Sequence, residues 1–308
     1  MAAPTTPLRV GWHREHFLSP LLQLATQDKG RHIELVECPG GTGEMQVKLA
    51  AGEIDVCIAL TDALIAGLAN GQDAYRLVGR YIASPLRWAI ITGKESKYTD
   101  VAQLKGTTFG ISRLGSGSQV MASVLALREG WGADEQPKFK VNGQFKPLRD
   151  SVNAGETSVF LWEWFTTKPY VDSGEVRFIG SVETPWPSWS FAASTKADDD
   201  AVARFLASLQ PHVREFDSAA SRDGAAVAFV SQTFGQKPED VKDWLQTVKW
   251  EHHLPEVSRS VVFTTLTYVC QIGGADPSVL EKAGVVKPRE GGWKVDAFVN
   301  TGVAKIVE

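Results

Sequence analysis

Short apolar runs alternate with amphipathic stretches through the first half of the chain. Each unit of the pattern is an apolar run, a polar or glycine-containing loop, and a helical stretch closed by glycine. The runs are LRVGW (8–12), IELVE (33–37), IDVCIAL (54–60), TTFGI (107–111) and TSVFLW (157–162). Strict two-residue alternation is absent, which indicates strands buried on both faces of a sheet. Strands alternating with helices predict a parallel α/β sheet.

Polar residues mark where some of the expected helices begin. Thr61 or Asp62 can cap the helix after the third run, and Ser116 or Ser118 the helix after the fourth. The last third of the chain contains few apolar runs of this kind. It predicts helices over 198–216, 221–234, 238–247 and 257–271.

The loops of this pattern point to a binding function. In open parallel sheets, ligands bind outside the carboxyl ends of the strands. Each loop that follows an apolar run lies at such an end, and glycine, serine, histidine and tryptophan gather there. This clustering is the strongest functional signal in the sequence.

The loop PGGTGEM (39–45) opens the second helix. It is not a phosphate-binding P-loop, since no Lys-Ser/Thr follows, and Gln46 stands where G-x-G-x-x-G needs its last glycine. What remains is a helix N-terminus whose free N–H groups favour a carboxylate or phosphate. Alternatively, Glu44 caps this helix and the loop is only a tight turn. The candidate ligand contacts are Gly41, Thr42 and Gly43.

The loop SRLGSGS (112–118) is a second one of the same kind. It offers hydroxyl groups and open backbone, and Arg113 adds a positive charge. We expect an anion site here, with a simple serine-capped turn as the alternative. The candidate contacts are Ser112, Gly115, Ser116, Gly117 and Ser118.

Histidine, glutamate and tryptophan supply further candidates. His13 and His16 lie three residues apart, but a metal site would need a third ligand that the sequence does not provide, so we expect no metal. These histidines either hydrogen-bond a ligand or lie on a surface loop. Glu163 directly follows a strand beside Trp162 and can accept from a ligand N–H, or it is a solvated helix start. Trp186 and Trp189 lie in a proline-bounded loop and form either an aromatic platform for a planar ligand or core.

Composition and charge indicate which classes of binding partner are expected. The 308 residues, 43% of them hydrophobic, are enough for two domains with sizeable cores. The net charge is −4 and no basic stripe occurs, so nucleic acid is not an expected partner. No apolar stretch is long enough to span a membrane, and no surface for a protein partner stands out. The three isolated cysteines and the absence of a secretory pattern predict a cytoplasmic protein.

With these pieces in place, the sequence resembles the type 2 periplasmic-binding-protein superfamily. It is most similar to the branch of alkanesulfonate, taurine and thiamine-pyrimidine binding proteins. The matching segments, in order, are LRVGW, ECPGGTGEMQVKLAAGEIDVCIALTDALIAG, YIASPLRWAIITG, and the stretch from YTD through LKG and TTFGIS to GSGS. The SPLRWAI run and the missing signal resemble a fungal intracellular subgroup. The resemblance covers residues 8–195 well.

The resemblance implies an α/β fold of two lobes, each a mostly parallel sheet flanked by helices. Residues 1–92 and 194–308 would form lobe one and residues 93–193 lobe two, with crossovers near Ile91–Lys94 and Phe191–Thr195. The lobes would close by hinge motion on a small polar ligand, planar or anionic and similar to the thiamine pyrimidine, in a cleft between them. The loops lining this cleft would include Thr61, Asp62 and Ser84 besides the residues above.

Enzymes share this fold, so an enzyme of thiamine or cofactor metabolism, with His13, His16 or Glu163 as acid–base groups, is the alternative function. The fungal thiamine-pyrimidine synthases carry a cysteine-rich run where this chain has TPWPSWSFAAS, and they use pyridoxal phosphate with a lysine. Here only Lys48 lies near the glycine loop. These departures favour a binding protein without catalytic residues or cofactor.

Overall fold

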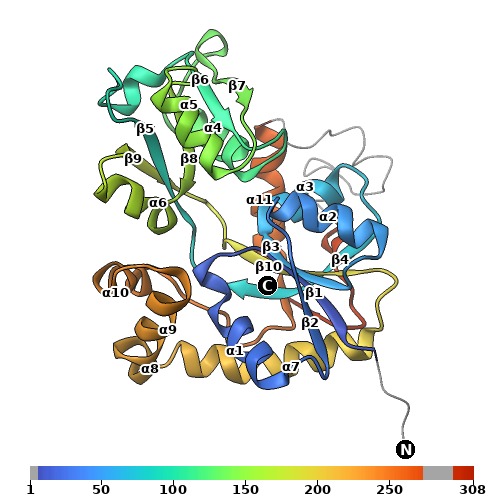
Figure 1. Ribbon diagram of the computed structural model, residues 1–308. Coiled ribbons are helices and arrows are strands. Elements are labelled where there is room, and N and C mark those ends of the chain that lie inside the picture. The colour runs from blue at the N-terminus through green and yellow to red at the C-terminus, as the bar shows by residue number, and fades with distance from the viewer. Residues whose placement is uncertain (1–5, 273–293) are drawn as a thin grey trace, which may run out of the picture. The chain divides into compact units, whose positions relative to one another are not determined.

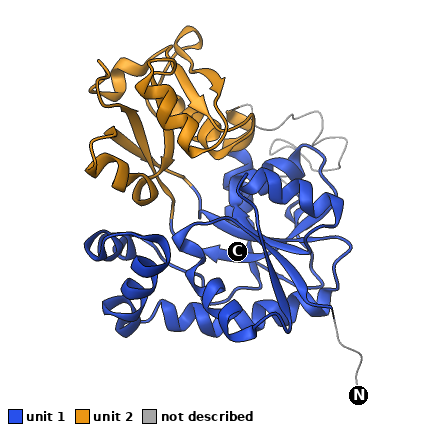
Figure 2. Ribbon diagram, viewed as in Figure 1, with its two compact units in different colours: residues 1–84, 186–267, 275–308 blue, residues 85–185, 268–274 orange. Residues whose placement is uncertain are grey.

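The chain folds into two compact units. The computed structural model describes residues 6–272 and 294–308 (Figure 1). Unit 1 comprises residues 1–84, 186–267 and 275–308, and unit 2 comprises residues 85–185 and 268–274 (Figure 2). The chain therefore leaves unit 1 after Ser84 and returns to it at Trp186.

These boundaries differ from those that the sequence suggested. The expected boundaries, 92/93 and 193/194, fall inside strands β5 (Arg87–Gly93) and β10 (Trp189–Ser194). Strand β5 pairs with strands of unit 2, and β10 pairs with strands of unit 1. Both crossings thus lie eight residues earlier, beside Pro85 and Pro185. An apolar run in the sequence predicts a strand, but it does not predict which sheet that strand joins.

Unit 1 is built on a five-stranded sheet in the order β2-β1-β3-β10-β4. Strands β1 and β2 are parallel, as are β1 and β3, while β10 runs antiparallel to both β3 and β4. The bounds of the strands not yet given are β1 Leu8–Trp12, β2 Ile33–Glu37, β3 Val56–Leu60 and β4 Tyr75–Ile82.

Helices cover this sheet and complete unit 1. A 3-10 turn, η1 (His16–Leu18), leads into α1 (Ser19–Asp28), and α2 (Thr42–Ala51) and α3 (Thr61–Ala69) follow β2 and β3. The later elements are α7 Asp199–Phe216, α8 Ala219–Asp223, α9 Ala225–Phe234, α10 Pro238–Thr247, β11 Glu256–Ser258, α11 Arg259–Gln271, η5 Val295–Phe298 and β12 Lys305–Val307. Residues 268–271, the last turn of α11, are assigned to unit 2. The predicted helices of the last third are confirmed, except that Gly224 divides the expected helix 221–234 into α8 and α9.

Unit 2 repeats the same sheet plan in the order β7-β6-β8-β5-β9. Strand β6 runs parallel to β7 and β8, and β5 runs antiparallel to β8 and β9. The bounds of its remaining elements are η2 Val101–Leu104, β6 Thr108–Ile111, α4 Gly117–Arg128, η3 Ala133–Glu135, β7 Lys138–Val141, α5 Phe145–Asn153, β8 Val159–Glu163, α6 Trp164–Asp172 and β9 Val176–Glu183.

Both sheets are mostly covered on their two faces. Every residue of β10 is buried, as are the first four of β3, which explains why these segments lack two-residue alternation. In unit 2, Ile91, Leu148 and Phe160 belong to one buried cluster against which Phe145 and Trp162 pack. The prediction of two α/β lobes with mostly parallel sheets is confirmed.

Candidate ligand-binding edges

The carboxyl ends of the parallel strands meet at one edge of the unit 1 sheet. In the register of β1, Trp12 pairs with Glu37 of β2. Leu60 at the end of β3 pairs with Trp189, which begins the antiparallel β10, and Trp189 also pairs with Ile82 at the end of β4. We call residues 12–16, 37–43, 60–62, 82–84 and 186–190 the carboxyl edge of unit 1.

Several N–H groups of the glycine loop at this edge are already used in hydrogen bonds within the loop. Gly41 precedes α2 with a φ of 66°, a conformation that favours glycine. The N–H of Gly40 donates to the Glu44 carboxylate at 2.7 Å, and the N–H of Gly41 donates to the Cys38 carbonyl at 2.9 Å. The Thr42 hydroxyl accepts from the Leu60 N–H at 3.1 Å. Glu44 thus interacts with the helix start, as one alternative expected, and the N–H groups of Thr42 and Gly43 stay outside the helix's own ladder.

The two histidines have different surroundings. His13 is half-buried and its Nδ1 lies 3.0 Å from the Cys38 carbonyl oxygen, beside the glycine loop. Burial lowers the pKa of His13, although the Cys38 carbonyl acts in the opposite direction. His16 is 1% exposed and lies within an aromatic cluster, with its ring 4.3 Å from that of Trp244. Burial lowers the pKa of His16 to about 3, so its ring is neutral at physiological pH.

The residues after β3 contact the returning strand. The Thr61 hydroxyl lies 2.8 Å from that of Ser190, and no side chain caps α3, so the capping role expected for Thr61 or Asp62 is wrong. Asp62 is buried and accepts from the Trp186 indole N–H at 3.3 Å. Ser84 is buried as well, and its hydroxyl accepts from the Lys249 N–H at 3.1 Å.

Unit 2 gathers its loop residues in the same way. Glu163 at the end of β8 pairs with Trp88 near the start of the antiparallel β5, and Arg87 pairs with Glu183 at the end of β9. Strand β6 is parallel to β8, so Ile111 and the serine loop lie at this edge too. We call residues 87–88, 111–118, 163–164 and 183–184 the carboxyl edge of unit 2.

The serine loop starts α4 with well-ordered local contacts. Ser116 is the N-cap, accepting from the Gln119 N–H at 3.4 Å, which confirms the predicted cap. The Ser116 and Ser118 hydroxyls lie 2.9 Å apart, and the Ser112 N–H donates to Ser118 Oγ at 3.2 Å. Gly115 has a φ of 70° and donates its N–H to Gln119 Oε1 at 2.7 Å. No acidic residue lies in the first turn of α4, so its N-terminus is the most favourable of these helix starts for an anion.

Glu163 and Trp162 sit beside one another on β8 but have separate roles. Glu163 is 5% exposed and caps α6 by accepting from the Thr166 N–H at 2.6 Å. Trp162 stacks on Phe145 with ring centroids 5.0 Å apart, as part of the unit 2 core. Trp186, in unit 1, is 2% exposed.

The structure adds residues that the sequence reasoning did not single out. Ser190 contacts Thr61, Trp88 lies opposite Glu163, and the Arg87 guanidinium stacks 3.6 Å from the Trp164 ring centroid. All three missed residues lie on β5 or β10. These strands are antiparallel to their neighbours, so their N-terminal residues lie at the edge where the other strands end. The rule that ligands bind at the carboxyl ends of strands therefore does not point to these residues.

The chain was compared with families, curated proteins and solved structures. Residues 88–182 match the model of the Ca3427-like periplasmic-binding proteins. No curated protein matches the chain. In the ranges that the structure describes, no helix is long and apolar enough to cross a membrane.

Solved structures of the same fold cover nearly all of the chain. The CA3427 gene product of Candida albicans is 29% identical, with a TM-score of 0.84 over 99% of this chain and 99% of that chain. It is described as defining a family with the generic periplasmic binding protein fold.

Two sulfonate-binding proteins share the fold at lower identity. The alkanesulfonate-binding protein SsuA from Xanthomonas axonopodis pv. citri, bound to MOPS, is 20% identical, with a TM-score of 0.69 over 91% of this chain and 97% of that chain. The aliphatic sulphonate binding protein SsuA from Escherichia coli is 16% identical, with a TM-score of 0.67 over 99% of this chain and 94% of that chain. The two α/β units thus have the fold of the periplasmic binding proteins, and residues 88–182 are similar to the Ca3427-like group of that fold.

Proposed function

We propose that the protein binds a small polar molecule at the carboxyl edges of its units. One observation carries this proposal. In each unit, the N-termini of the helices that follow the parallel strands gather at one edge of the sheet. The chain crossings at 84/85 and 185/186 leave from these same edges. The relatives of this fold described as binding alkanesulfonates support a small ligand with an anionic group.

The charges at the two edges favour a ligand with distinct ends. At the carboxyl edge of unit 2, the N-terminus of α4 has hydroxyl groups and no acid in its first turn, so it suits an anionic group. At the carboxyl edge of unit 1, Asp62 supplies a carboxylate beside Trp186, and Glu44 supplies another at α2. These acceptors suit an N–H or amino group. A phosphorylated heterocycle such as the thiamine pyrimidine combines both ends.

We propose that capture occurs by bending at the crossings. In unit 1, the Ser188 N–H and hydroxyl both donate to the Ser84 carbonyl at 3.1 Å. In unit 2, the Thr184 N–H donates to the Leu86 carbonyl at 3.1 Å, and Thr184 Oγ1 accepts from the Leu86 N–H at 3.0 Å. Pro85 and residues 185–187 lie between these two paired sections, and the chain passes between the units again after Thr267. A hinge of a few residues is the usual device for domain closure.

Binding explains these residues better than acid–base catalysis. His16 has a pKa held to about 3 by burial, so it does not exchange protons near neutral pH. Burial raises the pKa of Cys38 to about 11, which leaves its thiol a weak nucleophile. All three cysteines are free thiols. We therefore infer a binding protein in a reducing compartment, the cytoplasm, which subcellular fractionation would test.

A thermal-shift screen tests the proposed function. The panel contains hydroxymethylpyrimidine and its phosphate, thiamine, taurine, MOPS and inorganic phosphate. A ligand present at 100 times its Kd adds about 2.7 kcal/mol to the stability of the folded protein. We expect one anionic compound to raise the melting temperature selectively.

Two variants locate the bound molecule. Ser112→Asp places a negative charge at the carboxyl edge of unit 2, and the nearly isosteric Ser112→Asn is its matched control. We expect the aspartate to abolish the shift and the asparagine to retain most of it. A flat response across the panel, or a shift that Ser112→Asp leaves intact, contradicts the proposal.

A further inference from the structure

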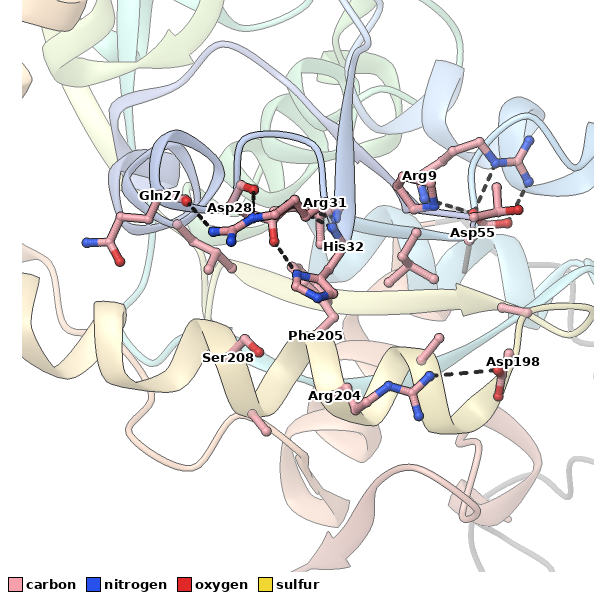
Figure 3. A pocket seen from close by; sticks show the side chains of 18 of the residues that line it. Arg9, Gln27, Asp28, Arg31, His32, Asp55, Asp198, Arg204, Phe205 and Ser208 are labelled. Carbon is pink, nitrogen blue, oxygen red and sulfur yellow. Dashed lines mark hydrogen bonds and ion pairs between the residues drawn. The ribbon is translucent and has the colours of Figure 1, made fainter. Parts of the chain in front are cut away.

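A pocket lies in unit 1, away from the candidate edges. It has a volume of about 1090 Å³ and is lined by residues of α1, α7 and the beginnings of β1 and β2 (Figure 3). Leu8 and Ile33 are the first residues of their strands. The pocket is therefore at the amino ends of the parallel strands, opposite the carboxyl edge of unit 1. Its volume is near the upper end of the range of about 300–1,000 Å³ that is typical of small-molecule sites.

The lining of this pocket has an apolar part. Leu8, Ile33, Leu24 of α1 and Phe205 of α7 all contribute to it, and each is between 3% and 8% exposed. Ala201 lies one turn before Phe205 on the same helix. These side chains bring aliphatic and aromatic surface from two helices and two strands to one place, which suits an apolar ligand segment.

The two buried or half-buried carboxyl groups of the pocket already accept hydrogen bonds from neighbouring residues. Asp55 accepts from the Arg9 N–H at 2.8 Å and from its Nε at 3.0 Å. Asp28 accepts from the His32 N–H at 2.9 Å and from the Ile33 N–H at 3.1 Å, and it lies 2.7 Å from His32 Nδ1. Burial acts to raise the pKa of Asp28, but these hydrogen bonds outweigh it and lower the pKa overall. Neither acid is available to neutralise a further cation.

Among the described residues, Arg31 and Lys196 have no carboxylate within ion-pair distance, and Arg204 has one solvent-exposed partner. The Arg31 guanidinium donates only to the backbone carbonyls of Asp28 at 2.9 Å and Gln27 at 3.2 Å. Arg204 lies 3.9 Å from Asp198, with both side chains about two-thirds exposed, so solvent weakens this pair. Lys196 makes no side-chain hydrogen bond or ion pair with the described residues.

Figure 3 shows how these groups are arranged. Arg31 and His32 lie before β2, over the helix α7 that carries Arg204, Phe205 and Ser208. The apolar lining therefore has Arg31 on one side, before β2, and Arg204 on the other side, on α7.

We propose that this pocket binds an amphipathic organic anion, with a hydrocarbon chain against the apolar lining and a carboxylate near Arg31 and Arg204. The apolar contact provides binding free energy in proportion to the area it buries. The guanidinium groups recognise the planar carboxylate through charge-assisted hydrogen bonds. This site is independent of the ligand proposed for the carboxyl edges.

Calorimetric titration of the full chain with octanoate tests the proposal. Octanol, which has the same chain length without the charge, is titrated in parallel. We expect saturable octanoate binding that weakens about tenfold or more in the double variant Arg31→Gln, Arg204→Gln. Arg128→Gln, an exposed arginine of α4, is the matched control and leaves the affinity unchanged.

A second variant separates the apolar contribution from the charge. Ala201→Trp fills the pocket without changing its charge, so we expect it to abolish the binding of both octanoate and octanol. Octanoate binding that is lost in Ser112→Asp but kept in the arginine and Ala201 variants assigns the ligand to the carboxyl edges and overturns the proposal. Absence of saturable binding overturns it as well.

Discussion

The indole N–H of Trp186 donates to the buried carboxylate of Asp62 across 3.3 Å, although the two residues lie 124 positions apart in the chain. Asp62 lies in the first turn of the helix after β3, and Trp186 is the first residue of unit 1 after the chain returns from unit 2. This contact therefore ties the second crossing to the start of α3.

Trp186→Phe tests the strength of this contact. The substitution keeps an aromatic ring but removes the donor to a buried carboxyl oxygen, a loss of about 1–3 kcal/mol in the free energy of unfolding. Urea denaturation measures this change. Trp162→Phe, at another tryptophan whose ring stacks on Phe145, is the control for a smaller ring. Equal losses in both variants would show that the hydrogen bond contributes little.

The Glu44 carboxylate lies in the first turn of α2, where it would oppose the binding of an external anion. Its carboxylate accepts from the Gly40 N–H, so Glu44→Gln removes a negative charge next to the N–H groups of the first helical turn. We expect the variant to lose about 0.3–1 kcal/mol of stability, because the helix dipole is no longer opposed there. If an anion binds at α2, its affinity rises in the variant. Equilibrium titration with the compound found in the thermal-shift screen measures this, and unchanged affinity would place the anion at α4 alone.

Acid conditions destabilise the protein through His16. Its folded-state pKa of about 3 lies below the ordinary 6.5, so the unfolded chain binds a proton that the folded state excludes. The stabilisation is fully present above pH 6.5 and is lost as the pH falls toward 3. Between pH 7.5 and pH 5, we expect His16 alone to cost about 2 kcal/mol.

The variant His16→Gln isolates this effect because it cannot titrate. Its stability, measured by urea unfolding at the two pH values, falls less than that of the parent protein. His253→Gln, at an exposed histidine, is the control and retains the full pH dependence. If the stability of all three proteins fell by the same amount between the two pH values, His16 would be protonated in the folded state.

Gly79 and Gly41 have different surroundings, so we expect their substitution by alanine to reduce the stability by different amounts. A Cβ on Gly79 in β4 would lie 2.1 Å from the Leu254 carbonyl oxygen, so Gly79→Ala must displace backbone. We expect a loss of about 2–3 kcal/mol or more. Gly41 has open space around its Cβ position, but its φ of 66° and ψ of −152° lie in a region that is almost restricted to glycine, so Gly41→Ala costs about 1–3 kcal/mol of backbone strain without a steric clash. Thermal unfolding of both variants checks this order, which equal melting temperatures would contradict.

The sequence by itself predicted the elements of the fold well. Strands β1 and β2 coincide with the apolar runs LRVGW and IELVE, and α10 covers the predicted range 238–247. These signals are local, because apolar runs, glycine ends and a proline at a helix start need no distant partner. The order of loops along the chain also predicted which residues gather at the strand ends.

Only the tertiary structure decided the pairing of strands and the burial of single side chains. The positions of β5 and β10 in their sheets moved both crossings to Pro85 and Pro185, and antiparallel pairing brought Trp88 and Ser190 to the edges. The burial of His16 among aromatic rings and the pocket beside α7 depend on contacts between residues far apart in sequence. Such contacts arise from the packing of elements against one another, and the local pattern of a sequence does not specify that packing.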